Sequence, residues 1–335
     1  CDHIRESRLV AFDTEFVSEN TYRPVLCLVQ FATREQCAAV DPFAVDVSEW
    51  WDIMADDETV VVVHAGREET RFCLTATGQR PRKMYDIQLA EGLRTPSYPL
   101  SYERLLSRVL DVTVQSSETR TDWQRRPLTE RQINYALDDV RYVIEVYDQQ
   151  REWLDKKGRL IWAEEEFEQL ITDMEVERGD GTWQKLSGIR RLSSRQLAVA
   201  RELYIWRRNV AEQRDSPVRR VLRDDLIIDL ARRQPQSESD LLRSREMGRT
   251  NFRRHTQEII DCVNRALELP REELPKKFQN SKSGPDDPVI GKLLALALAN
   301  QCAELGVAAG LVGTSSDLKA LVSWYTSQCP EDRRP

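Results

Sequence analysis

The sequence predicts a mixed α/β domain followed by all-helical domains. Short β-rich runs alternate with helical ones between Arg8 and Ile87, whereas the β signal fades after Ser101. The chain has 335 residues, and a single domain usually has roughly 100–150. Its hydrophobic content of 40% is enough to bury cores, and its 31% of charged residues is of mixed sign. A folded chain of two or three domains is therefore expected.

The elements of the first domain follow from the length and composition of each run. The β-rich runs are Leu9–Phe12, Val25–Phe31, Cys37–Val40 and Val60–Val63. Short connections between the first three favour an antiparallel meander. A helix is expected at Ser48–Ala55. A second helix-length segment, Glu68–Thr77, separates the fourth run from a strand near Met84, as a parallel crossover requires. The sheet is therefore expected to be mixed and flanked by helices.

The rest of the chain has a helical pattern and is interrupted by two linkers. Thr129–Leu154 is a long helical stretch that opens with a Thr129 cap and has Pro127 just outside it. Glycines at positions 179, 181 and 188 mark one loose connection, and a segment rich in Pro, Lys and Ser, Leu274–Pro288, marks another. We therefore expect domains at residues 1–175, 187–270 and 286–330.

Charge is distributed unevenly along the chain. The net charge is −7, which is unusual for a protein that binds phosphates through Lys and Arg. Between Ser187 and Ile260, however, 17 arginines face 10 acidic residues, so this segment carries +7 and the remainder −14. A basic helical segment of this kind favours contact with nucleic acid. An ordinary charged helical surface is the alternative that charge alone leaves open.

The cysteine content indicates the cellular compartment. The seven cysteines form no C-x-x-C pair and are odd in number, which argues against a zinc cluster and against a secreted disulfide framework. A cytoplasmic location is therefore expected. No apolar run approaches the roughly 20 residues of a bilayer span, so no membrane association is expected. The first residue is Cys1 rather than Met, which is compatible with a start further upstream.

Two pairs of residues are candidates for chemistry. Asp13 and Glu15 lie two apart at the end of the first strand, so their side chains point to the same face. Crowded carboxylates favour a hard divalent cation with oxygen ligands, although most acid-x-acid pairs are solvated surface. Tyr135 and Asp139 lie four apart on one helix face. By themselves they are better interpreted as a core aromatic and a surface acid.

The order of five short segments is more specific than either pair. The segments are Asp13-Thr14-Glu15-Phe16, His64-Ala65-Gly66-Arg67-Glu68-Glu69, Tyr85-Asp86-Ile87-Gln88, Arg120-Thr121-Asp122-Trp123 with Arg126-Pro127-Leu128-Thr129, and Tyr135-x-x-x-Asp139. Together they resemble the ribonuclease D members of the DEDD exonuclease superfamily over residues 8 to 165, most specifically between Ser117 and Asp139. The resemblance implies a ribonuclease H-like fold and a 3′-5′ exoribonuclease.

The resemblance also implies a set of site residues. Four acids of the family hold two divalent cations, Mg²⁺ or Mn²⁺, and the matching positions here are Asp13, Glu15, Glu69 and Asp139. Tyr135 takes the place of the residue that orients or deprotonates the attacking water, which assigns the tyrosine subclass. Glu69 departs from the family, which has an aspartate there, so a catalytically weakened RNA-binding homologue is one alternative. A DNA exonuclease is the other.

Two residues next to these motifs are interpreted as structural. His64 is interpreted as a packed structural histidine and Asp86 as a helix cap.

Leu192–Ala266 looks like the helicase and ribonuclease D carboxyl-terminal (HRDC) domain, and Val289–Ser327 resembles a further helical domain of that type. The arginines expected to hold RNA phosphates are Arg207, Arg208, Arg219, Arg220, Arg232, Arg233, Arg253 and Arg254.

The family's typical partner is RNA with a single-stranded 3′ end, above all transfer RNA precursors. The expected products are nucleoside 5′-monophosphates. No obligate protein partner is inferred.

Overall fold

The computed structural model describes residues 1–114, 121–178, 180–243, 253–278 and 287–326. It divides into two compact units. Unit 1 comprises Cys1–Val17, Leu26–Glu175 and Ser281–Pro335, and unit 2 comprises Ser18–Val25 and Val176–Asn280. Ser117 and Arg120 of the family-specific segment lie outside the described residues.

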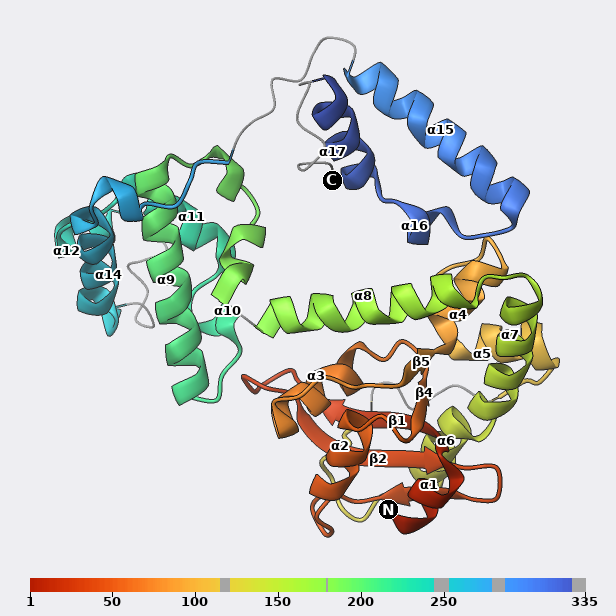
Figure 1. The fold of residues 1–335 in the computed structure, drawn as a ribbon. Helices are drawn as coiled ribbons and strands as arrows, with labels where there is room; N and C mark the ends of the chain where they lie inside the picture. Colours follow the sequence, from red (N-terminus) through yellow and green to blue (C-terminus); the bar gives the residue numbers. More distant parts are fainter. Residues whose placement is uncertain (115–120, 179, 244–252, 279–286, 327–335) are drawn as a thin grey trace. The chain divides into compact units, whose positions relative to one another are not determined.

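Unit 1 is built around a five-stranded sheet with the order β3-β2-β1-β4-β5 (Figure 1). The strands are β1 (Leu9–Val17), β2 (Val25–Ala32), β3 (Cys37–Val40), β4 (Val60–Val63) and β5 (Met84–Asp86). β2 and β3 pair antiparallel, whereas β4 pairs in parallel with β1 and with β5. The expected mixed sheet is confirmed. β1 is longer than predicted, because it continues past Phe12 to Val17.

Helices precede, separate and follow the strands of this unit in sequence. They are α1 (Asp2–Ser7), α2 (Ser48–Ala55), α3 (Arg67–Thr77), α4 (Ile87–Arg94), α5 (Tyr102–Leu110), α6 (Glu130–Arg141), α7 (Val143–Lys156) and α8 (Leu160–Arg178). The prediction of α2 is confirmed. The long helical stretch expected at Thr129–Leu154 is interrupted, because Tyr142 has φ −105° and ψ 0° between α6 and α7.

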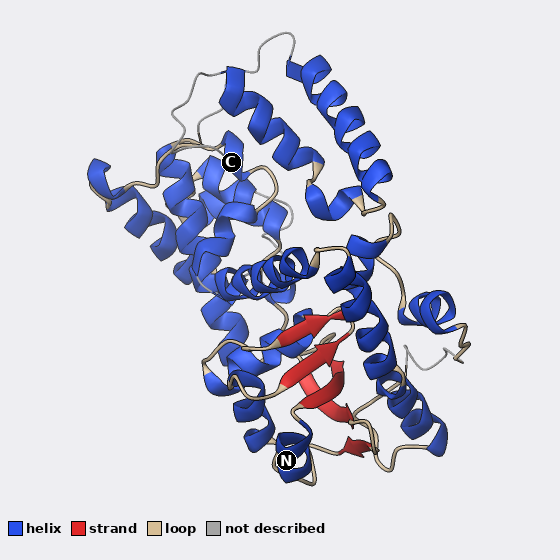
Figure 2. Ribbon diagram, turned by 45° about the vertical axis from the view of Figure 1, so that its right-hand side comes forward, coloured by secondary structure: helices blue, strands red, loops and turns tan. Residues whose placement is uncertain are grey.

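Alternate residues of β1 and β4 bury opposite faces of the sheet. Val10 and Phe12 belong to a core that includes Trp50 of α2. Ala11 and Val62 belong to a second core, which contains side chains of α4, α5 and α7. Figure 2 shows the strands as one layer with helices on both sides. This period-two burial fixes which face of β1 each later residue of the strand occupies.

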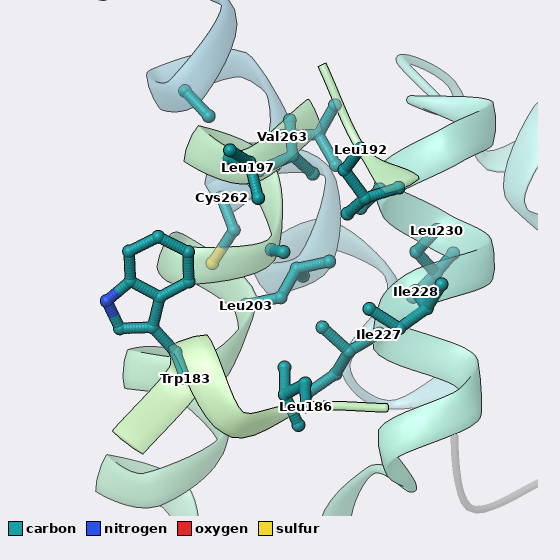
Figure 3. Close-up of a cluster of buried hydrophobic side chains, with 14 of the residues drawn as sticks. Trp183, Leu186, Leu192, Leu197, Leu203, Ile227, Ile228, Leu230, Cys262 and Val263 are labelled. Atoms are coloured by element: carbon teal, nitrogen blue, oxygen red, sulfur yellow. The ribbon is translucent and has the colours of Figure 1, made fainter. Parts of the chain in front are cut away.

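Unit 2 is helical. Its elements are η1 (Asp180–Lys185), η2 (Ile189–Arg191), α9 (Ser194–Gln213), α10 (Val218–Val221), α11 (Asp224–Arg233), α12 (Glu238–Leu242), α14 (Thr256–Glu268) and η3 (Arg271–Glu273). Leu197 and Leu203 of α9 meet Ile227 of α11 and Val263 of α14 in one core (Figure 3). A Ser193 cap with Gln196 at the third helical position begins α9. The helical carboxyl-terminal half is confirmed.

The last described helices are α15 (Asp287–Leu305), α16 (Ala309–Val312) and α17 (Ser315–Thr326), which are grouped with unit 1. Leu311 of α16 packs against the core of α4, α5 and α7. The Ala308 amide donates a hydrogen bond of 2.7 Å to the Gly92 carbonyl. None of the described helices has both the length and the apolar character needed to cross a bilayer.

Candidate active site

The acidic pair of β1 lies where the strand extends beyond its parallel neighbour. Ala11 is paired with Val62, and β4 ends at Val63, so Asp13 comes after the paired region. Asp13 and Glu15 share the face of Ala11 because side chains alternate along a strand. The carboxyl ends of parallel strands are where α/β sheets commonly bind ligands.

Tyr135 and Asp139 are presented by α6, which contacts β1. The helix begins with a capping box: the Gln132 amide donates to the Thr129 hydroxyl at 3.2 Å, and the Thr129 amide donates to Gln132 Oε1 at 2.9 Å. Because the two residues are four apart, the Tyr135 phenol reaches Asp139 and donates a hydrogen bond to its carboxylate. The helix thus joins a phenol and a carboxylate beside the acidic strand.

Glu69 approaches from the first turn of α3. It is 4% exposed, and its carboxylate accepts a hydrogen bond of 2.7 Å from the Thr14 hydroxyl. Thr14 alternates to the opposite face of β1 from its acidic neighbours. The longer glutamate side chain therefore has a hydroxyl partner in this structure. Sequence reasoning missed Thr14, because no spacing rule within β1 relates it to Glu69, 55 residues away.

The four carboxyl groups influence one another strongly. Burial raises the pKa of Asp13 well above its usual range, and the charges of Glu69, Asp139 and Glu15 raise it further. Burial, Asp139 and Glu69 together raise the pKa of Glu15 to about 8. Burial is also the main cause that raises the pKa values of Glu69 and Asp139 to about 7 each. Ionising all four without a cation is therefore unfavourable.

The arrangement brings these groups near one another without forming a complete metal centre. Among the described residues, no three His, Cys, Asp or Glu side chains are grouped so that they could hold one ion as they stand. The electrostatic effects on Asp13 nonetheless come from segments of β1, α3 and α6. The carboxylates are therefore neighbours, and their side chains would have to turn to share an ion.

Asp86 holds the turn that leads into α3. Its carboxylate accepts hydrogen bonds from the amides of Gln88 and Leu89, which makes it the cap of α4, as predicted. It also accepts from the amides of Ala65 at 3.1 Å and Gly66 at 2.9 Å. One buried carboxylate thus fixes two consecutive loops at the end of the sheet.

His64 has the structural role expected of it. Its Nε2 lies 3.1 Å from the Leu100 carbonyl oxygen, and its ring centroid lies 5.6 Å from that of Tyr102. Burial is the main cause that lowers the pKa of His64. Tyr102, which the sequence did not single out, donates a hydrogen bond of 3.1 Å to the Asp138 carbonyl and so ties α5 to α6.

Arg126 fixes the segment before α6 to the sheet. Its guanidinium donates to both carboxylate oxygens of Asp41, at 2.6 and 2.9 Å. It also donates to the Cys27 carbonyl at 2.7 Å and to the Trp123 carbonyl at 2.7 Å. The Trp123 ring lies 6.2 Å from the ring of Tyr135. The motif arginine is therefore a structural anchor, and two of its partners, Asp41 and Cys27, lie far away in sequence.

Not every arginine expected to meet RNA is available for it. Arg207 is 3% exposed and donates to the Leu222 carbonyl at 2.8 Å and to Asp224 at 2.5 Å. The expectation that Arg207 holds a phosphate is wrong, because the helical periodicity of α9 turns it into the core. Arg233 is also paired, with Asp229 at 3.1 Å.

Comparisons with known proteins agree with this architecture. A family model described as 3′-5′ exonuclease matches residues 1–155, and one described as HRDC domain matches residues 196–263. Ribonuclease D of Sphingobium indicum is 33% identical over 96% of this chain and 84% of that protein. Ribonuclease D of Jannaschia sp. is 31% identical over 97% and 86%.

A solved structure gives the same result. The crystal structure of Escherichia coli RNase D, described as an exoribonuclease involved in structured RNA processing, matches with a TM-score of 0.86 and 27% identity. The match covers 100% of this chain and 90% of that one. From these identities, the two matching family models and the shared fold, we conclude that the chain belongs to the ribonuclease D family and is a 3′-5′ exoribonuclease.

Proposed function

We propose that this exoribonuclease uses water to cleave the last phosphodiester bond of an RNA 3′ end and releases nucleoside 5′-monophosphates. Two divalent cations, Mg²⁺ or Mn²⁺, would be held by Asp13, Glu15, Glu69 and Asp139. The observation that carries this proposal is the convergence of the four carboxylates, three of which raise the pKa of the fourth, Asp13. Each comes from β1, α3 or α6.

The donor set fits hard cations. Carboxylate oxygens are the ligands that Mg²⁺ and Mn²⁺ prefer, and a cation offsets the repulsion that raises these pKa values. The Thr14 hydroxyl donates to Oε1 of Glu69, and Oε2 would be the oxygen that Glu69 contributes to an ion. When bound, two such ions stabilise the attacking and leaving oxygens of an in-line displacement at phosphorus.

Tyr135 would orient the attacking water. Burial and the nearby carboxylates Asp139 and Glu15 raise its pKa, so the phenol keeps its proton at neutral pH in the metal-free protein. Its hydrogen bond to Asp139 holds the ring toward the carboxylates. Orientation of the water is therefore favoured over its deprotonation by this residue.

The substrates we propose are RNAs with a single-stranded 3′ end, with transfer RNA precursors as the family's typical example, in the cytoplasm. The basic helical segment would supply affinity for phosphates without reading bases. We retain residues 1–175 as the catalytic domain. Residues 187–270 and 286–330 would form two helical domains of the HRDC type.

A specific observation favours a second candidate, an RNA-binding protein with little catalytic activity. The carboxylate of Glu69 already has a buried hydroxyl partner, and glutamate is one methylene longer than aspartate at a position where Mg²⁺ geometry tolerates little error. This candidate shares every other feature of the site.

One digestion experiment separates the two. The wild type and Asp13→Asn would be incubated with a 3′-tailed RNA hairpin and a matched DNA hairpin, at increasing Mg²⁺ or Mn²⁺. The proposal expects 5′-mononucleotides from RNA with the wild type only, and unchanged RNA affinity for the variant. Binding without cleavage by the wild type would favour the second candidate, and equal cleavage of DNA would remove the restriction to RNA.

A further inference from the structure

Unit 2 contains a cavity of about 470 Å³ that the catalytic site does not use. It is formed where η1 and α9 meet the segment that follows η3. Its lining residues are Trp183, Gln184, Arg201, Pro275, Lys276, Lys277 and Phe278. The volume is within the range of roughly 300–1,000 Å³ that is common for ligand sites.

Two aromatic side chains line this cavity. Trp183 is 7% exposed and packs at the edge of the helical core, and Figure 3 shows its indole nitrogen pointing away from Leu203 and Leu186. No acceptor for that nitrogen is found among the described residues. Phe278 is half-buried, and the guanidinium of Arg190 lies 5.8 Å from its ring centroid. Flat apolar surfaces held in this way suit a planar ring system.

The cavity also carries positive charge that nothing in the described residues neutralises. Arg201, Lys276 and Lys277 line it, no carboxylate does, and none of the three is in an ion pair there. Other arginines of the same unit differ in this respect. Arg207 is paired with Asp224, and Arg265 is paired with Glu202. Unpaired cations around a cavity attract an anion.

We propose that this cavity is a subsite for one unpaired nucleotide of a single-stranded RNA, whose base lies against Trp183 and Phe278 while its phosphates meet the three cations. Stacking on aromatic rings combined with a basic surface is how proteins hold single strands without reading sequence. Gln184 is the only lining side chain that can accept a hydrogen bond, so the subsite offers little to distinguish bases by their donor groups. The inference rests on the proposed action on RNA and adds where the strand is held.

A strand fits the charges better than a free nucleotide. Lys276 and Lys277 are consecutive and exposed, so they offer two cations to successive phosphates. The cavity lacks carboxylates to bind ribose hydroxyls. A free mononucleotide would gain stacking and a single phosphate contact only.

Binding of a fluorescein-labelled oligo(U) RNA, followed by fluorescence anisotropy, tests the subsite. The full-length chain carries Asp13→Asn so that the probe is not cleaved. Phe278→Leu keeps apolar packing but removes the ring, and we expect about tenfold weaker binding. Phe278→Tyr keeps the ring and should bind within about twofold of the parent. A blunt RNA duplex offers no unpaired base and should bind Phe278→Leu and the parent equally.

A matched pair of lysine variants tests the charge. Lys277→Gln should weaken binding and reduce the slope of log affinity against log salt by about 0.7, the value for one phosphate of a single strand. Lys185→Gln makes the same change at a lysine that pairs with Glu177 outside the cavity, and the slope should not change. If Phe278→Leu does not fold, as judged by circular dichroism, this pair alone decides.

Three results would overturn the subsite: oligo(U) affinity of Phe278→Leu equal to that of the parent, equal effects of the two lysine variants, or displacement of oligo(U) by uridine monophosphate at concentrations near the affinity of the strand. Cleavage by the wild type is measured separately on the same RNA. Its absence would refute the proposed function and leave the binding comparison intact.

Discussion

Removing the charge of Glu15 should stabilise the metal-free protein. The pKa of this carboxyl is raised from 4.5 to about 8, mainly by burial and then by Asp139. Between these values the folded state holds a proton that the unfolded state has released, so the free energy of unfolding falls as the pH rises. At about 1.4 kcal/mol for each pKa unit, Glu15 lowers stability by about 3 kcal/mol at pH 7.

The assay is guanidinium unfolding in EDTA at pH 5 and pH 7. The wild type should lose about 2 kcal/mol over this interval from Glu15, with further loss from the other raised carboxyls. Glu15→Gln should be more stable than the wild type at pH 7 and less dependent on pH. Glu164→Gln is the matched control, because it makes the same change at an exposed position of α8. A wild type that keeps its stability from pH 5 to pH 7, or an unstabilised Glu15→Gln, would refute the reasoning.

Three further predictions concern single side chains. Tyr135→Phe should lower kcat by roughly 10²–10⁴ with little change in KM, measured on a 3′-tailed RNA; an unchanged kcat would exclude a role in orienting the water. Glu69→Asp should maintain or raise activity, because the shorter side chain no longer accepts the hydrogen bond from the Thr14 hydroxyl. A large loss of activity would show that the backbone has adapted to glutamate. Asp86→Ala should cost about 3 kcal/mol in thermal unfolding, because four amides lose their acceptor; a change below about 0.5 kcal/mol would contradict its role.

Local signals in the sequence predicted most of the elements. The bounds of β3, β4 and α2 follow from the runs of apolar residues, and Thr129 and Asp86 were identified as caps because capping depends on neighbours in the sequence. The order of the motifs predicted the fold class because it combines five such segments.

What the sequence could not predict depends on contacts between distant residues. The break at Tyr142 has no proline or glycine to announce it. Nothing in the sequence around Asp41 indicates that its carboxylate binds Arg126, 85 positions away. Arginine is usually a surface residue, and only the packing of α9 shows that Arg207 is buried.

The sequence predicted part of the candidate site but not all of it. Alternation along β1 and helical spacing in α6 predicted which residues share a face, since both rules act within one element. The hydrogen bond between Thr14 and Glu69 joins two elements, 55 residues apart, and no spacing rule reveals it. The assignment of Asp13, Glu15, Glu69, Tyr135 and Asp139 as site residues stays a prediction.

The central claim is that carboxylates from β1, α3 and α6 share divalent ions, and the most direct test is to count those ions. Isothermal titration of the metal-free protein with Mn²⁺, repeated with Asp139→Asn, gives the number of ions bound per chain. Our account predicts two ions for the wild type and a loss of at least one site in the variant. A wild type that binds no Mn²⁺, or a variant that binds as many ions with equal affinity, would contradict it.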